Sequence, residues 1–296
     1  MGAIIHISIR RNLLNIIYLS IYYYLRKVVT IILNNVYNFN DSLIFAYLMF
    51  LGAFFGGLAV YIYQRFFVIK ENNNLKYLGI TIIDKRIKRL NKSDKSIKII
   101  ILIVFAAFFD FMQFTIASFY IPKFLIVSPT ATYRFGCIII MVGAILCHYD
   151  LRIKILKHQF YSLIILGICS SLIILFEFIY RKSSISLGEF CLAYLLVLLN
   201  LIFVAFTDVI EKYLLEYNFV NPFSTISIES IFGFIFLTIF SIGKNQFNEL
   251  KKEYEKGDTI KFIFLIILLF LYLVFSAGTN VYKILTNGIY SPVVKT

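Results

Sequence analysis

Residues 190–207 read FCLAYLLVLLNLIFVAFT, a stretch without a single charged side chain. Two further stretches, 160–176 and 262–275, are equally free of charge. A helix needs roughly 20 mostly apolar residues to cross the hydrocarbon core of a bilayer. Together with its flanking residues each stretch reaches that length, so the sequence predicts a protein built from membrane-spanning helices.

The composition of the whole chain supports the same class. Of its 296 residues 60% are hydrophobic and 15% are charged, and the mean hydropathy is +0.84. Soluble domains carry about 25% charged residues, so an ordinary soluble globular protein is excluded. We predict an all-α polytopic membrane protein with spans at 13–36, 43–67, 99–121, 131–149, 160–180, 190–213, 222–242 and 260–282.

The first of these windows has an alternative interpretation. Arg26 and Lys27 fall in its middle. A helix with charges in that place can lie flat in the membrane interface instead of crossing the bilayer. We favour a span and keep the interfacial helix as the alternative.

Positive charge is concentrated in one connecting segment. The net charge is +13, and ten of the 29 Lys and Arg residues lie between Arg65 and Lys98. Basic loops stay on the cytosolic side of a membrane. We therefore place the loop 70–98 and the N-terminus in the cytosol, and we interpret the charge as a topology signal and not as a nucleic-acid surface.

The chain carries the same dipeptide after two different windows. Ser128-Pro129 follows the third window, and Ser291-Pro292 follows the eighth. These windows are five apart, and an odd number of spans per copy inserts the second copy upside down, as in many secondary transporters. We predict an inverted repeat of five-helix units, with residues 1–182 as the first copy and 183–296 as the second.

Several short motifs resemble one family. They are MFLG at 49–52, FD at 109–110, SPTATYR at 128–134, and a block with EKY at 211–213, NP at 221–222, Glu229 and FGF at 232–234. The chain resembles the drug/metabolite transporter superfamily, and within it the nucleotide-sugar-transporter-like proteins of the solute carrier 35 F group.

The resemblance implies ten spans in two inverted halves, with spans three, four, eight and nine lining a central cavity. Because eight windows are present, we expect the second repeat to be incomplete. Two positions depart from the family pattern: Ala53 stands where a Glu is common, and Phe135 replaces a Gly. Both departures bear on which solute is bound.

Polar residues inside the windows are the candidates for solute binding, because ionisable groups are costly in hydrocarbon. In the third window these are Asp110, Gln113 and Thr115. Asp110 either contacts a solute hydroxyl or a proton, or it is neutral and hydrogen-bonded to a neighbouring helix. Gln113 and Thr115 by themselves would be ordinary interhelical hydrogen-bond partners.

Two basic residues could make the site electropositive. Arg134, just after the Pro129 break, could bind a phosphate or carboxylate; the alternatives are an Arg that reaches the interface or that pairs with Asp110. Lys283, together with Asn280, ends the eighth window and could add to the site, although a terminal Lys commonly serves as a topology anchor.

A second group of residues is expected to gate the protein or to hold its structure. Asp208, Glu211 and Lys212 lie on neighbouring faces near the cytosolic end of the sixth window, where charge costs little. We favour a structural ion pair or gate and keep solute contact as the alternative. Glu229 would fix packing or act as a gate. Gly52, Gly56 and Gly57 indicate a packing face. The remaining members are the two breaks, Ser128, Pro129, Ser291 and Pro292.

The leading hypothesis is a secondary carrier that moves a small polar or anionic metabolite, such as a nucleotide-sugar-like solute, by alternating access. The rivals are a non-transporting multi-span scaffold or receptor-like protein and a membrane-embedded transferase. We expect no catalytic residues, metal or cofactor. The expected partners are the solute and the lipid bilayer, with a homodimer left open. The resemblance suggests an internal membrane such as that of the Golgi, lysosome or vacuole.

Overall fold

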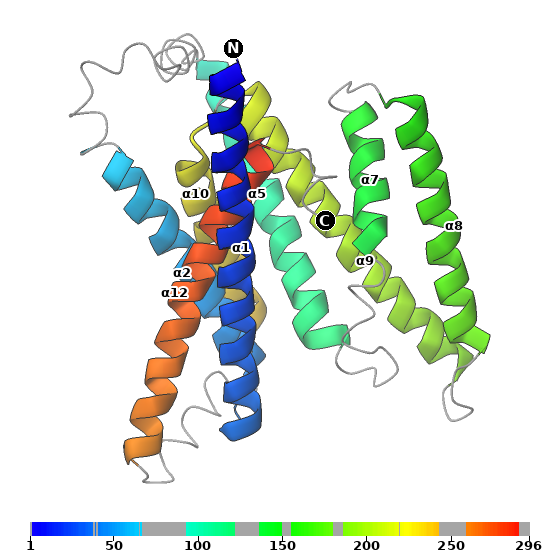
Figure 1. Ribbon diagram of the computed structural model, residues 1–296. Helices are drawn as coiled ribbons and strands as arrows, with labels where there is room; N and C mark the ends of the chain where they lie inside the picture. Colours follow the sequence, from blue (N-terminus) through cyan, green and yellow to red (C-terminus); the bar gives the residue numbers. More distant parts are fainter. Residues whose placement is uncertain are drawn as a thin grey trace. The chain divides into compact units, whose positions relative to one another are not determined.

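The computed structural model describes ten groups of residues, and all of its regular elements are helices. The described residues are 2–37, 39, 41–64, 66, 93–121, 136–149, 155–179, 186–218, 220–242 and 259–289. The helices are α1 (Gly2–Val36), α2 (Ser42–Tyr63), α5 (Ser93–Thr115), η3 (Ile116–Tyr120), α7 (Gly136–Tyr149), α8 (Lys157–Ile179), α9 (Leu187–Lys212), η5 (Tyr213–Tyr217), α10 (Pro222–Ser241) and α12 (Thr259–Ile289). Figure 1 shows them along the chain.

Six of the predicted spans are confirmed as helices long and apolar enough to cross a membrane. They are Leu13–Val36, Ser42–Tyr63, Ile97–Tyr120, Leu187–Leu215, Pro222–Ser241 and Thr259–Thr286. The fourth and fifth predicted spans overlap α7 and α8, and their crossing of the bilayer stays a prediction. The protein is therefore an all-helical integral membrane protein.

Local chemistry explains where three of the helices begin. The Asp41 carboxylate accepts hydrogen bonds from the amides of Leu43 and Ile44 at the start of α2. Ser186 and Glu189 form a reciprocal capping box at the start of α9. Asn221 caps α10. Each cap satisfies amides that have no partner inside the helix.

The residues form two compact units. The first contains Met1–Val104 and Leu214–Ile289, so it holds α1, α2, α10 and α12; the second contains Phe105–Tyr213. Each unit thus takes helices from both predicted repeats. The predicted repeat boundary at 182/183 therefore does not coincide with the boundary between the units. Two repeats that exchange helices do not have to form separate compact units.

In the first unit α2 packs between α10 and α12. A Cβ at Gly52 would lie 2.6 Å from the carbonyl oxygen of Leu273 in α12, and one at Gly57 would lie 2.6 Å from Oγ of Ser227 in α10. Neighbouring atoms this close to the glycine Cα leave room only for its hydrogen atom. The prediction that Gly52, Gly56 and Gly57 form a packing face is confirmed.

The helix α1 packs along α12, as seen in Figure 1. The ring of Tyr282 stacks on Tyr18 at 5.3 Å and on Tyr22 at 5.7 Å between ring centroids. At the other end of the contact, Leu33 packs with Leu265. The two helices are therefore antiparallel over their length. This packing favours a spanning α1 over a helix lying flat in the interface.

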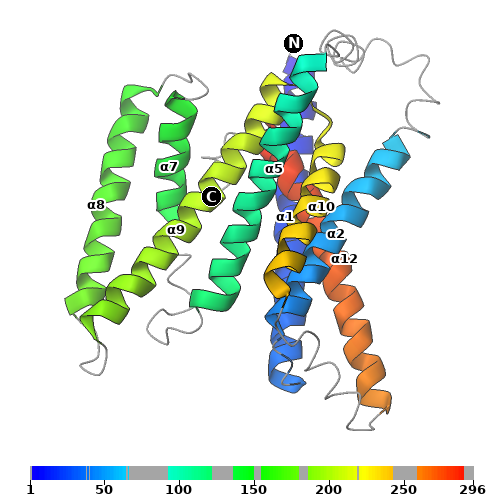
Figure 2. The ribbon, with the colours of Figure 1, turned by 180° about the vertical axis from the view of Figure 1, so that it is seen from behind.

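The second unit contains the end of α5, η3, α7, α8 and α9; α7, α8 and α9 are also visible from behind in Figure 2. Its core joins Ile116 and Ile121 to residues 190–201 of α9. Further along α9, the ring of Phe109 stacks on Phe203 and Phe206, with centroids 5.6 and 5.2 Å apart. Because higher numbers on α5 and η3 meet lower numbers on α9, these segments are also antiparallel.

Candidate functional site

The three candidate residues of the third span do not share one face of the helix. Asp110 and Gln113, one turn apart, are both half-buried. Thr115 lies about 140° from Asp110 around the helix. Its side chain is buried, and its Oγ1 has no hydrogen-bond partner among the described residues. Asp110 and Gln113 can therefore serve one site, whereas Thr115 points into the core of the unit.

The local structure fixes how Asp110 is presented. Its neighbour Phe109 is held by ring stacking on Phe203 and Phe206 of α9. The π-helical turn η3 begins only six residues after Asp110. Such turns are rare and occur frequently at functional sites. A clamped ring on one side and an irregular turn on the other set the rotation of Asp110 about the helix axis.

Two buried polar residues of α9, Asn200 and Thr207, were missed in the sequence. Asn200, Thr207 and Glu211 follow one another at spacings of seven and four residues, which places them on one face of the helix. All three are buried. The hydroxyl of Thr207 donates to the carbonyl of Phe203 at 3.1 Å, while Oδ1 of Asn200 has no hydrogen-bond partner among the described residues. An asparagine inside an uncharged apolar run was the signal.

The three charged residues of α9 lie near the end of the span, which reaches Leu215. Asp208, Glu211 and Lys212 are nevertheless buried, being only 1%, 3% and 4% exposed. None of the three charged side chains is without a partner.

The first unit carries a polar stripe of its own, on α12. Ser276, Asn280 and Lys283 follow one another at spacings of four and three residues and so lie on one face. Tyr282 belongs to the different face that packs on α1. Lys283 was expected to end the span, but α12 continues to Ile289. The ammonium group is therefore carried within the helix.

Glu229 belongs to α10, a helix that also carries the buried serines Ser227 and Ser230. Glu229 itself is buried. The hydroxyls of Ser227 and Ser230 donate to the carbonyls of Phe223 and Ile226, which lie one turn earlier in α10. Because these hydroxyl protons are used within the helix, the serine oxygens are left as acceptors.

Five candidate residues lie outside the residues that the structure describes. They are the basic Arg134 and the two Ser-Pro breaks, Ser128, Pro129, Ser291 and Pro292. Their roles stay predictions. Within the described ranges, no three His, Cys, Asp or Glu side chains are grouped so that they could hold a metal ion.

Comparisons with known proteins neither support nor contradict the family resemblance that the motifs indicate. No family model matches the chain, and no curated protein or solved structure gives a significant match. The resemblance to the drug/metabolite transporter superfamily therefore rests on the motif residues alone and stays a prediction.

Proposed function

We propose that the chain is a secondary carrier of the drug/metabolite transporter type. It moves a small polar or anionic solute, such as a nucleotide sugar, by alternating access. In this proposal the protein lies in an internal membrane, and its N-terminus and the loop 70–98 are on the cytosolic side. The observation that carries it is the choice of helix partners in the two units.

An inverted repeat relates spans one, two and three to spans six, seven and eight. A contact of span one with span eight must then be matched by a contact of span six with span three. The first contact is that of α1 with α12, and the second is that of α9 with η3. Span two and span seven, α2 and α10, pair with each other, as equivalent helices beside a two-fold axis do.

The direction of these pairs also agrees with the proposal. In α2 and α10, Tyr47 contacts Phe234 and Thr238, whereas Gly57, further along α2, lies against Ser227, earlier in α10. The pair is antiparallel. Two equivalent helices related by an axis in the membrane plane are antiparallel at their contact, as carriers with inverted repeats have them.

The polar side chains supply the chemistry that such a carrier needs. Asp110 and Gln113 offer a carboxylate and an amide to solute hydroxyl groups, and Lys283 with Asn280 offers a cation and an amide to a phosphate or carboxylate. These groups lie on the third and eighth spans, which correspond to each other in the predicted repeat. The two sets of groups match the chemistry of a solute that carries hydroxyls and negative charge.

The test uses the purified 296-residue chain in proteoliposomes loaded with unlabelled solute. Uptake by counterflow is measured for a panel of labelled nucleotide sugars and sugar phosphates. We expect exchange of at least one panel member, and we expect Asp110→Asn and Lys283→Gln to reduce it about tenfold or more, the equivalent of losing about 1.4 kcal/mol of binding.

Matched controls carry the same chemical changes elsewhere. Asp41→Asn keeps the cap of α2, and Lys261→Gln alters an exposed residue in the first turn of α12. Both variants should exchange solute at the parental rate. No exchange by the parent protein, together with no thermal stabilisation by any panel member, would favour the non-transporting scaffold instead.

A further inference from the structure

The helices α7 and α8 border an open groove that the proposed transport function does not use. It consists of two hollows, of about 640 Å³ and about 430 Å³. Both hollows are lined by Met141 of α7 and Ile164 of α8, so they adjoin. We propose that this groove binds an anionic phospholipid, with its phosphate at the first hollow and one acyl chain along the second.

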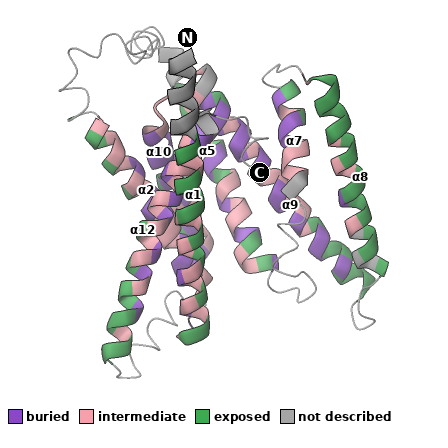
Figure 3. Ribbon diagram, in the orientation of Figure 1, coloured by how far each residue is buried: buried purple, intermediate pink, exposed green. Residues whose placement is uncertain are grey.

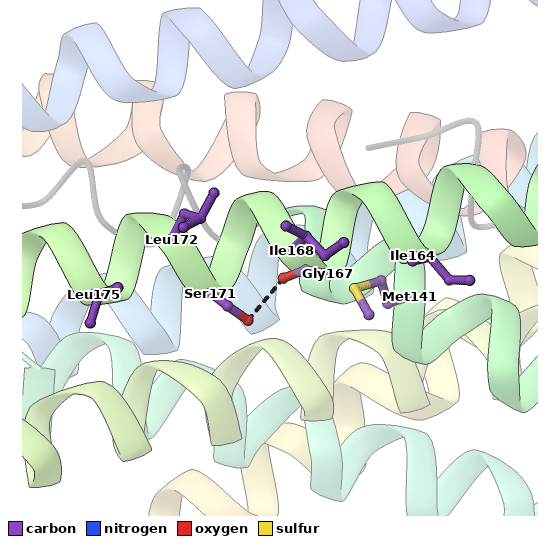
Figure 4. A pocket seen from close by; sticks show the side chains of 7 residues that line it. All are labelled: Met141, Ile164, Gly167, Ile168, Ser171, Leu172 and Leu175. Atoms are coloured by element: carbon purple, nitrogen blue, oxygen red, sulfur yellow. Dashed lines mark hydrogen bonds between the residues drawn. The ribbon is translucent and has the colours of Figure 1, made fainter.

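The second hollow has the surface that an acyl chain requires. Figure 4 shows its lining along one side of α8, with Met141 of α7 opposite. The only hydroxyl in the lining belongs to Ser171, which donates to the carbonyl of Gly167 at 2.9 Å. Its proton is therefore already used within the helix, and the remaining wall is apolar.

The length of the second hollow fits one leaflet. From Ile164 to Leu175 the helix rises by about 16 Å, at 1.5 Å per residue. Half of a hydrocarbon core about 30 Å thick is about 15 Å. A compact polar solute would not fill such a slot, whereas an acyl chain entering at the interface would.

The first hollow has the composition of a headgroup site. His148 and Tyr149 end α7, and Lys157, Phe160 and Tyr161 begin α8. Aromatic rings concentrate at the membrane–water interface, where a Lys side chain also extends its ammonium group toward the headgroups. None of the described lining residues is acidic. Basic pockets between membrane helices select lipids with anionic headgroups.

The groove is open along one side. Ile168, Leu172 and Leu175 are exposed, and Figure 3 shows exposed residues along most of α8. An occupant can therefore enter from the bilayer without any movement of the helices.

The experiment exploits the absence of tryptophan from the chain. Phe160→Trp places a single fluorophore in the first hollow, and Phe270→Trp places one on α12 at a side chain that is 63% exposed. Each protein is reconstituted in phosphatidylcholine vesicles. A small fraction of the lipid is replaced by phosphatidylserine or phosphatidylcholine, either one brominated in its acyl chains.

We expect brominated phosphatidylserine to quench the tryptophan at 160 with an apparent affinity about fivefold higher than that of brominated phosphatidylcholine, the preference expected from one lysine near the headgroups. The tryptophan at 270 should not distinguish the two lipids. Equal quenching by both lipids at position 160 would overturn the proposal. So would quenching by neither lipid in a dimeric protein, because a second copy would then fill the groove.

Two matched pairs of variants distinguish lipid binding in the groove from a general attraction of anionic lipid to the protein. Lys157→Glu should abolish the preference at position 160, whereas Lys98→Glu, at an exposed lysine predicted on the same side of the membrane, should leave it. Ser171→Phe should block the second hollow and lower quenching, whereas Cys169→Phe, exposed on α8 outside the lining, should not. Equal effects within either pair would count against a lipid held in this groove.

Discussion

The ring of Phe50 in α2 lies directly over the backbone of Gly233 in α10. A Cβ built at position 233 would collide with three atoms of that ring. The contact joins the second and seventh spans, the pair that the predicted repeat makes equivalent. Association of helices in a bilayer depends on packing of this kind, because lipid is as apolar as the side chains.

Gly233→Ala should therefore destabilise the protein by about 1–3 kcal/mol, the usual cost of forcing an added carbon into a packed contact. The measurement is unfolding in detergent micelles followed by circular dichroism. Gly188→Ala is the matched control, because a Cβ at Gly188 has no neighbour within 4 Å. That variant should remain within about 0.5 kcal/mol of the parent. Equal stability of the two variants would mean that Phe50 can move away without cost.

The ring of Phe109 provides a second test, in the other compact unit. Phe109→Ala removes stacking on both Phe203 and Phe206, and each ring pair contributes about 0.5–1.5 kcal/mol. We expect a loss of about 1–3 kcal/mol. Phe105→Ala, one turn earlier on a ring that is 51% exposed, should cost less than half as much. If the two variants lose the same stability, α5 does not depend on this clamp.

The fold was predicted from the sequence to the extent that hydrophobic runs determine it. Six windows became helices of spanning length, and the glycines of α2 were correctly assigned to packing. The ends of helices were predicted less well, because a helix can continue past the residue at which the hydropathy of the sequence drops. Lys283 was placed at the end of its span, yet α12 continues to Ile289.

The candidate site was predicted in part, because burial depends on neighbours that a single sequence does not name. Thr115 looked equivalent to Asp110 on spacing within one turn, but the helix turns it into the core. Asn200 drew no attention because it is uncharged. Its significance follows from a buried oxygen with no hydrogen-bond partner in the described part of the chain.

Asn200→Leu tests whether that oxygen is kept for a solute. A buried carbonyl without a partner costs about 1–3 kcal/mol, so the leucine variant should be at least as stable as the parent. If Asn200 contacts the solute, exchange in proteoliposomes should nevertheless fall about tenfold. Thr207→Val, in the same stripe, alters a hydroxyl whose proton is used within the helix and should affect exchange less. A leucine variant that is less stable would indicate a structural partner for Asn200.

The cap of α2 gives a prediction with a conservative rescue. Asp41 accepts from the amides of Leu43 and Ile44 at 3.0 and 3.1 Å. Asp41→Ala should cost about 0.5–2 kcal/mol, whereas Asp41→Asn keeps an acceptor oxygen and should cost only a few tenths. Thermal unfolding of both variants at neutral pH measures the difference. Equal losses would show that the negative charge matters and the hydrogen bonds do not.

Whether α8 crosses the bilayer decides the relation between the two repeats. At 1.5 Å per residue its 23 residues extend about 34 Å, enough for a hydrocarbon core of about 30 Å. If α8 crosses, the first repeat has five spans and the second is inverted. If α8 lies flat, the first repeat keeps four spans, and an even number inserts the second copy in the same direction as the first.

Single cysteines at Arg152→Cys and Ser183→Cys, before and after α8, distinguish these cases. They are introduced after the four native cysteines have been replaced by alanine. In sealed vesicles of one orientation, a membrane-impermeant maleimide should label only one of the two positions, and permeabilisation should expose the other. Labelling of both positions from the same side would remove the upside-down relation of the repeats. The agreement between the α1–α12 and α9–η3 contacts would then need another cause. Repeats inserted in the same direction are not related by a two-fold axis in the membrane plane.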